Sequence, residues 1–200
     1  MQAIGFNEHY GLQTAVIEKW KTMTRRFEKG LENLEEGNFC FNKAKGEIYL
    51  YGEKGTIIET IKTRYKIGEV VAIKQCYRDI IDQLPDRMKE YVIGYYSNSE
   101  AWTNKMFIRP DLMPRHIRIT DIKVERLQDI SDEDCMKEGI LHWKGSTYEN
   151  LSTEHFHFRG CNDTYSSSTE AFAHLIDKVS KKGTWERNPY VPAYSFELID

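Results

Sequence analysis

"RHIRITDIKVERL", Arg115 to Leu127, alternates apolar and polar residues in the manner of a strand with one buried face. The apolar positions are Ile117, Ile119, Ile122 and Val124. The alternation slips by one position at Thr120–Asp121, and such a slip is typical of a β-bulge. The stretch therefore predicts a long, bulged strand.

Three further segments carry helix signals. Ser131 followed by Asp134 is an N-cap signature, so "SDEDCMKEG" is predicted to be a short helix that ends at Gly139. "SSTEAFAHLIDKVSKKG" has a Ser/Thr cap, apolar residues at helical spacing, basic residues in its last turn and a final glycine. Leu12 to Trp20 has the spacing of an amphipathic helix, and Asp86 to Tyr91 predicts a short one.

The remaining segments read as strands. "FCFNKAKGEIYLYGEKGTIIETIKTRY" predicts a pair of hairpins broken at its glycines, and Glu69 to Gln75 predicts a buried strand. "AYSFELI" predicts a last strand near the end of the sequence. Several strands with few helices and no regular β-α alternation indicate an α+β fold, with a mostly antiparallel sheet or a small barrel.

Length and composition indicate one folded domain. The sequence has 200 residues and a net charge of only −3, so any contact with nucleic acid would need a local basic patch. Its four cysteines form no CxxC pair, which argues against a zinc ribbon and indicates reduced thiols. No segment resembles a signal peptide or reaches the roughly 18 apolar residues of a membrane span. We therefore expect a soluble, cytoplasmic protein with no membrane partner.

The segment "KTMTRR" holds the first candidate site residues. A threonine hydroxyl such as that of Thr24 is a weak nucleophile and needs a neighbouring base. Lys21 can serve only if burial or nearby cations lower its pKa, and Arg25 and Arg26 are such cations. A spacing of three places Lys21 and Thr24 on one side of a helical turn but on opposite faces of a strand, so this use requires a turn. The alternative is an exposed basic turn whose hydroxyls bond to the backbone.

Further candidates lie downstream. Glu138, just before Gly139, is either a pocket acid that partners Lys21 or a solvated carboxylate at a helix end. Basic residues from Lys105 to Arg126, together with nearby aromatic residues, could contact phosphates and stacked bases, although strand alternation alone explains much of this pattern. Trp185 and Asn188 belong to a proline-bounded loop that either packs on the core or walls a pocket.

His155, His157 and Cys161 are metal ligands by type. However, no second Cys/His pair completes a set, and alternating His and Phe is also typical of a half-buried strand. We therefore expect neither a metal ion nor a cofactor.

Four of these stretches together resemble the ASCH family of the PUA-like superfamily, especially its longer members in phages and prophages. They are "GLQTAVIEKWKTMTRR", "YKIGEVVAIKQCY", "MPRHIRITDIKVERLQDISDEDCMKEGI" and "FAHLIDKVSKKGTWERNPYVPAYSFELI". They run in family order and together cover 85 of the 200 residues. The sequence departs from the family pattern at Tyr190 and Pro192, and at Lys74-Gln75, where an Arg-Glu pair is common.

The resemblance implies a single domain over residues 1–200, built as a small, mostly antiparallel PUA-like β-barrel with flanking helices and a cleft near "KTMTRR". Segments at about 28–63 and 79–108 have no clear family counterpart and are predicted to be insertions, the first of them made of hairpins. The oligomeric state is not predicted.

The resemblance also implies a function, and three hypotheses stay open. The first is a cleft that binds RNA or a modified nucleotide. Its contacts would be Thr22, Arg25, Arg26, Arg115, Trp185 and Asn188. The second is an amidohydrolase that removes an acyl group from acetylated cytidine, with Thr24 as nucleophile, Lys21 as its base and Glu138 orienting Lys21 or protonating the leaving group. The third is a phage accessory protein that binds a host protein.

Overall fold

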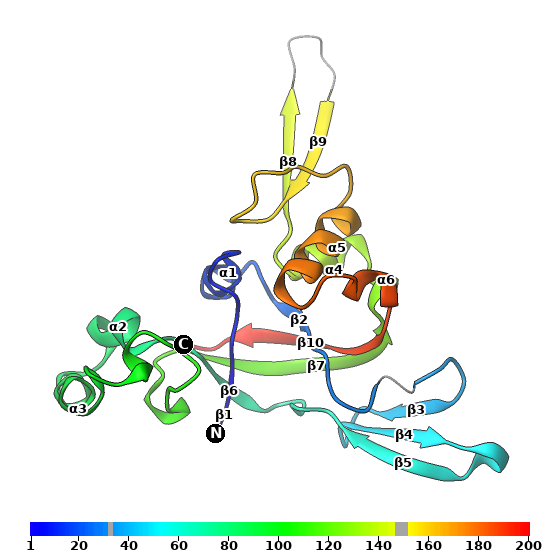
Figure 1. Cartoon of the computed structure of the whole chain (residues 1–200), viewed down its shortest axis with the longest axis horizontal. Coiled ribbons are helices and arrows are strands. Elements are labelled where there is room, and N and C mark those ends of the chain that lie inside the picture. Colours follow the sequence, from blue (N-terminus) through cyan, green and yellow to red (C-terminus); the bar gives the residue numbers. More distant parts are fainter. Residues whose placement is uncertain (32–33, 147–151) are drawn as a thin grey trace.

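The computed structural model describes residues 1–31, 34–146 and 152–200, and a mixed five-stranded sheet lies at its centre (Figure 1). The order of the strands is β1-β6-β7-β10-β2. β1 pairs with β6 in parallel, and the other pairs are antiparallel. The strands are β1 (Gln2–Ile4), β2 (Met23–Arg25), β6 (Val70–Ile73), β7 (His116–Arg126) and β10 (Tyr190–Leu198).

The predicted bulge in the long strand is confirmed. Along β7 and β10, Ser195 pairs with Asp121 but the next residue, Phe196, pairs with Ile119, so Thr120 is the extra residue of β7. The bulge lets the strand keep its apolar side chains on one face on either side of Thr120. Ile119 and Ile122 are accordingly both buried in the main core.

The α+β class is confirmed, but the described strands do not form the closed barrel that was expected. The sheet ends at β1 on one side and at β2 on the other, and no pairing within the described ranges joins these two edges. Each edge strand has only three residues, and the chain between them forms helix α1 (Leu12–Ile17). None of the strands in the described part of the chain bridges these edges, so the five-stranded sheet is open.

Four helices lie on one face of this sheet (Figure 1): α1, α4 (Asp132–Lys137), α5 (Ser168–Val179) and α6 (Thr184–Arg187). α4 begins as predicted, because the Ser131 hydroxyl accepts a hydrogen bond of 3.2 Å from the Asp134 backbone N–H. Ser167 caps α5 in the same way. α1 is shorter than predicted and ends before Lys19, whose φ of 66° is left-handed.

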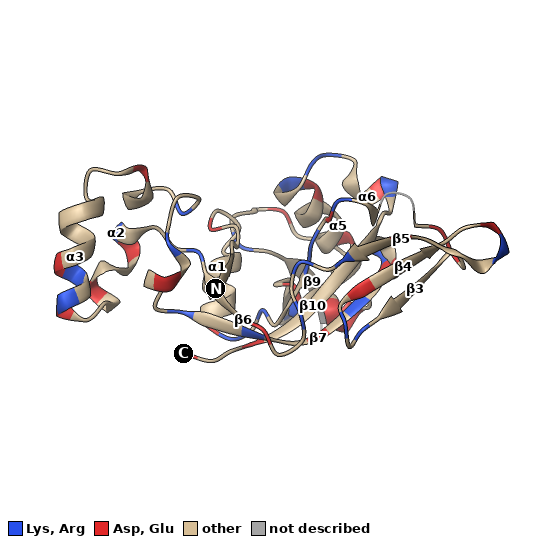
Figure 2. Cartoon of the chain, turned by 90° about the horizontal axis from the view of Figure 1, so that it is seen from below, with Lys and Arg blue, Asp and Glu red and all other residues tan. Residues whose placement is uncertain are grey.

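Two smaller units lie at opposite ends of the molecule, as two views at right angles agree (Figures 1 and 2). At one end, an antiparallel sheet of β3 (Phe39–Asn42), β4 (Glu47–Tyr51) and β5 (Ile57–Lys62) has its own apolar core. At the other end, α2 (Tyr77–Ile80) and α3 (Asp86–Tyr96) enclose a second small core. These units contain the segments at about 28–63 and 79–108, whose assignment as insertions stays a prediction; residues 32–33 of the first lie outside the described residues.

The last antiparallel pair is a hairpin of β8 (Leu141–Ser146) and β9 (Ser152–His157) that projects from the body (Figure 1). His155 and His157 lie on β9, and no group of three metal-ligating side chains occurs among the described residues. The four cysteines are free. Short 3-10 turns complete the fold: η2 (Glu53–Gly55), η3 (Ile81–Gln83), η4 (Glu100–Trp102), η5 (Pro110–Leu112) and η6 (Leu127–Asp129). None of the helices in the described ranges is long and apolar enough to span a membrane.

Candidate functional site

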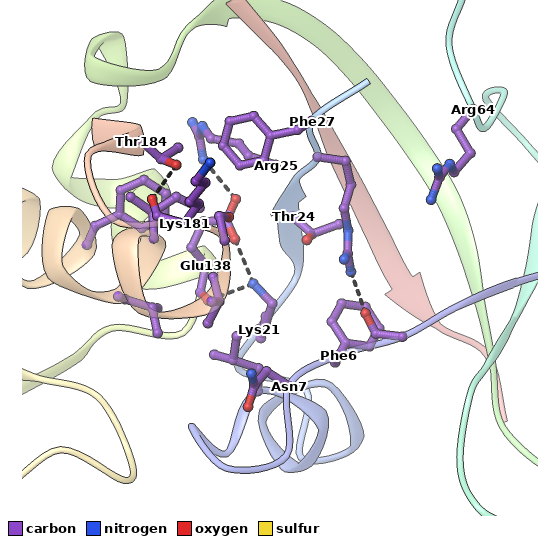
Figure 3. A pocket seen from close by; sticks show the side chains of 18 of the residues that line it. Phe6, Asn7, Lys21, Thr24, Arg25, Phe27, Arg64, Glu138, Lys181 and Thr184 are labelled. Carbon is purple, nitrogen blue, oxygen red and sulfur yellow. Dashed lines mark hydrogen bonds and ion pairs between the residues drawn. The ribbon is translucent and has the colours of Figure 1, made fainter. Parts of the chain in front are cut away.

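A cavity of about 640 Å³ opens beside β2 and is closed on its far side by α5 (Figure 3). The segment after β1, the start of α1 and the residue that follows α4 complete its wall. Among the described residues, its lining contains a single acidic residue, Glu138. The same lining contains seven basic residues: Lys21, Arg25, Arg26, Arg64, Lys105, Lys181 and Arg187.

Lys21 lies in the irregular segment between α1 and β2, and only 2% of it is exposed. Its Nζ donates to the Glu138 carboxylate at 2.7 Å, to the Glu138 backbone carbonyl at 2.6 Å and to the Met23 carbonyl at 2.8 Å. An ammonium group has three N–H donors, so all of them are used. Burial lowers the pKa of Lys21 below its ordinary value, although the Glu138 carboxylate opposes that shift.

Glu138 follows the last turn of α4 and is held there by the local backbone. Gly139 comes next with a φ of 108°, a conformation that glycine adopts without strain. A Cβ at Gly139 would lie 3.1 Å from Leu12 and 3.7 Å from the Lys21 side chain, so glycine also permits this close approach. The carboxylate bridges two cations, because its second oxygen accepts from Arg25 Nη1 at 3.1 Å. These cations offset the unfavourable place of an acid at a helix C-terminus.

Arg25 is part of the framework of the site. Its Nε and Nη2 both donate to Glu125, Nη2 also reaches Asp134 at 3.4 Å, and Nη1 donates to Glu138 and to the Met23 sulfur. Its five N–H donors are therefore all engaged by the protein. Burial lowers the pKa of Arg25, but Glu138 and Glu125 outweigh it and the net shift is upward. The predicted phosphate contact would thus need a donor that Arg25 does not have free.

Lys123 extends this charge network towards the surface. Its Nζ lies 2.5 Å from Asp134 and 2.8 Å from Glu125, so it shares both carboxylates with Arg25. Burial raises the pKa of Asp134, but Lys123 and Arg25 outweigh it and hold that pKa below its ordinary value. Asp134 therefore stays ionised behind the cavity and helps to fix Arg25.

Thr24 is the middle residue of β2 and pairs with Tyr194 of β10. Its hydroxyl has no hydrogen-bond partner among the described residues, and Figure 3 shows it directed into the cavity beside Lys21 and Glu138. No helical turn is needed for this arrangement, since Lys21 lies outside the strand and Thr24 within it. An ammonium, a hydroxyl and a carboxylate therefore share one concave space.

Arg26 differs sharply from its neighbour Arg25. Its Nη2 donates to the Gly5 carbonyl at 2.7 Å, and the guanidinium lies 5.3 Å from the centre of the Phe6 ring. Its Nε is buried without a hydrogen-bond partner, and Arg26 forms no ion pair with any described residue. Burial lowers the pKa of Arg26, and the charge of Arg64 adds to that effect. Arg26 is thus a partly desolvated cation in the cavity wall that lacks a counter-ion.

The other predicted contact residues lie outside the cavity lining given by the described residues: Thr22, Arg115, Trp185 and Asn188. The backbone of Thr22 bonds to Lys137 and Phe196, and the Arg115 carbonyl accepts from Ile73 in the central sheet. Trp185 packs edge-on against the Phe172 ring, while the Asn188 side chain accepts from the Gln128 N–H. Trp185 lies in α6 and Asn188 directly follows it, and this segment is packed on the core, which was one of its two predicted placements.

Other lining residues were not among the predicted contact residues. Arg64 follows β5 and carried no sequence signal. Lys105 belongs to the basic stretch that could contact phosphates, and it reaches across from the segment after η4 to donate to the Phe6 carbonyl at 2.5 Å and to pair with Glu8 at 2.8 Å. Phe27 directly follows "KTMTRR", so its proximity to that motif was the available clue. Lys181 was visible only as part of the basic end of α5, a common feature of helix termini.

Comparisons of the chain with protein-family models, with curated proteins and with solved structures gave no significant match. The resemblance to the ASCH family therefore rests on the quoted motifs and stays a prediction.

Proposed function

We propose that the cavity binds RNA or a nucleotide. The observation that carries this proposal is the charge of the lining, in which seven basic residues face one acid. Lys21 and Arg25 are neutralised inside the protein and Lys105 pairs with Glu8, whereas the others form no ion pair with described residues: Arg26, Arg64, Lys181 and Arg187. Unpaired cations around a concave surface favour an anionic ligand, and the guanidinium group of arginine can bind phosphate in a bidentate manner.

The opposite wall of the cavity suits a base or a sugar. α5 presents apolar side chains there, among them Phe172 and Ile176. Phe27 also lines the cavity and is 40% exposed, so its ring is accessible for stacking. A nucleotide combines a planar apolar group with a phosphate, which matches the pairing of this wall with the unpaired cations.

We also propose that the chain is an ASCH domain with a PUA-like framework. The order of the family motifs supports this assignment, as does the convergence of "KTMTRR" with Glu138 in one cavity. The β3–β5 sheet packs against Val124 of β7 and Tyr190 of β10, so it lies directly beside the open five-stranded sheet.

Binding can be tested by fluorescence anisotropy with labelled single-stranded RNA. We expect binding at low salt that weakens as salt rises, because neutralised phosphates release counterions. Arg26→Gln should weaken binding by roughly tenfold or more, the effect of losing a hydrogen bond to a charged group. Arg87→Gln on α3 is the matched control, since Arg87 is exposed and lies outside the lining. Absence of binding at low salt for every RNA and nucleotide tested would remove the proposal.

A second candidate function, amide hydrolysis, is favoured by the unpartnered Thr24 hydroxyl beside the Lys21–Glu138 pair. Neutral Lys21 would take the hydroxyl proton while the Thr24 oxygen attacks the acyl carbonyl of an acylated cytidine. The C–N bond then breaks and the amine leaves with the proton from Lys21. Water hydrolyses the resulting Thr24 ester and releases the acid. Glu138 orients Lys21 throughout.

This candidate predicts a particular pH dependence. As an ammonium, Lys21 has no lone pair, and its three N–H donors are all used in hydrogen bonds. It must therefore lose a proton before it can act as a base. Because burial lowers its pKa below the ordinary 10.5, we expect acetate release to rise with pH through an apparent pKa below that value. Thr24→Val should abolish release from acetylated cytidine while the unfolding midpoint stays close to that of the native protein. If the native protein releases no acetate from acetylated cytidine or its analogues, the candidate fails for this substrate class.

A further inference from the structure

The four unpaired cations of the cavity form two groups on opposite sides. Arg26 and Arg64 form one group, and Lys181 and Arg187 form the other. In Figure 3, Arg64 and Lys181 stand at opposite sides of the pocket, with Thr24 and Phe27 between them. The positive charge is therefore divided between two ends, which a ligand with a single anionic group would not match.

The first group is built around Arg26. Its buried Nε has no hydrogen-bond partner, and its only described hydrogen bond is to a backbone carbonyl. Arg64 is exposed, and its charge disfavours that of Arg26. These two cations repel each other, and Arg26 has a buried N–H donor without an acceptor. An anion between them would stabilise both.

The second group is organised by Thr184, which is 1% exposed. Its hydroxyl donates to the Lys181 carbonyl at 2.5 Å and accepts from Arg187 Nη2 at 2.9 Å. Thr184 thereby ties the backbone before α6 to the guanidinium at its end, and Lys181 and Arg187 both line the cavity. Basic residues also gather around the end of α5 and α6 in Figure 2.

Resting on the proposed function, we infer that the ligand is one nucleotide within a single-stranded RNA, with a phosphate at each end of the cavity. The phosphate on one side of the sugar binds Arg26 and Arg64, and the phosphate on the other side binds Lys181 and Arg187. The base lies between them against Phe27 and the apolar wall of α5. A free nucleoside fills neither phosphate position and a mononucleotide fills one. A base in a duplex is stacked and paired, so it does not reach Phe27.

The test measures displacement of a labelled single-stranded RNA hexamer by three competitors. We expect cytidine 3′,5′-bisphosphate to compete best, cytidine 5′-monophosphate less well and cytidine least. Arg64→Ala and Arg187→Ala should each weaken hexamer binding by about tenfold. Each should also reduce the slope of log K against log[salt] by about 0.7, the contribution of one phosphate in a single strand. Arg87→Ala should change neither quantity. Lys181→Ala provides an independent variant of the second group.

The outcomes separate this inference from the proposed function. If the hexamer binds but cytidine competes as well as the bisphosphate, the two-phosphate assignment is overturned while the binding function stands. The two-phosphate assignment is also overturned if Arg64→Ala leaves the affinity and the salt slope unchanged. It is likewise overturned if Arg187→Ala and Lys181→Ala both leave them unchanged. If neither the hexamer nor any nucleotide binds at low salt, the binding function itself fails. Melting curves check folding, and we expect only small changes because Arg64, Lys181 and Arg187 are exposed and form no ion pair with described residues. Arg187→Ala loses one hydrogen bond, to Thr184, which contributes about 1 kcal/mol.

Discussion

Replacement of Glu138 by glutamine should lower the free energy of unfolding by about 3–5 kcal/mol, the usual cost of removing one partner of a buried ion pair. The carboxylate is 5% exposed and lies within hydrogen-bond distance of both Lys21 and Arg25. Glutamine keeps the size of the side chain but not its charge, so two buried cations would lose their shared counter-ion. Urea unfolding followed by circular dichroism measures the loss.

Glu133→Gln is the matched control for this change. Glu133 also sits on α4 and pairs with a lysine, Lys137, at 2.7 Å, but its side chain is 78% exposed. Exposed pairs contribute little, so we expect a loss below about 1 kcal/mol. Equal losses for Glu133→Gln and Glu138→Gln would mean that the buried bridge does not stabilise the fold in the way described.

Arg25→Gln and Arg26→Gln are expected to separate stability from ligand binding. Arg25 is buried among three carboxylates, so its loss should cost about 3–5 kcal/mol of unfolding free energy. Arg26 gives up one hydrogen bond to a carbonyl, so the expected loss of stability is about 1 kcal/mol. Denaturant unfolding measures the unfolding free energy of both variants, and the RNA-binding assay measures their affinity for RNA. Similar losses of unfolding free energy in the two variants would contradict the assignment of Arg25 to stability and of Arg26 to ligand binding.

The Arg25 effect should also depend on pH. Arg25 helps to hold the pKa of Asp134 below its ordinary value of 3.8. A carboxyl with a depressed pKa stabilises the fold above that ordinary value, and the stabilisation is lost as pH falls through its folded-state pKa. The difference in unfolding free energy between the native protein and Arg25→Gln should therefore reach its full size above pH 3.8 and become smaller as pH falls below that value. A gap that widens on acidification would refute this account.

The sequence predicted those parts of the fold whose signal is local. The phase slip at Thr120 predicted the bulge because alternation records directly which face a residue occupies. Ser131 predicted the start of α4 because capping depends on a residue three positions away. The parallel pairing of β1 with β6 was not predicted, since three residues are too few to show alternation. Whether a sheet closes depends on how distant edges meet, so the barrel was inferred from resemblance and the open sheet was not foreseen.

The candidate site was predicted only in part for the same reason. Lys21, Thr24 and Glu138 came from motifs, and they do line one cavity. Arg25 ends β2 and Arg26 continues the extended chain, where neighbouring side chains point to opposite sides, but nothing local said which of the two would meet carboxylates. The acids that contact Arg25 come from segments far from "KTMTRR" in the sequence, and so do Arg64, Lys181 and Arg187. No sequence spacing links these residues to that motif.

Lys21 and Glu138 are 117 positions apart, and that separation has a consequence for the newly made chain. During synthesis the first half of the protein emerges with this lysine still solvated, and its partner arrives only after the long strand β7 and helix α4 have followed. Contacts between such remote positions form late, because closing a long loop costs entropy before any contact repays it. The cavity should therefore be one of the last features to mature, and a truncated chain that ends before α4 would display the "KTMTRR" segment without the site.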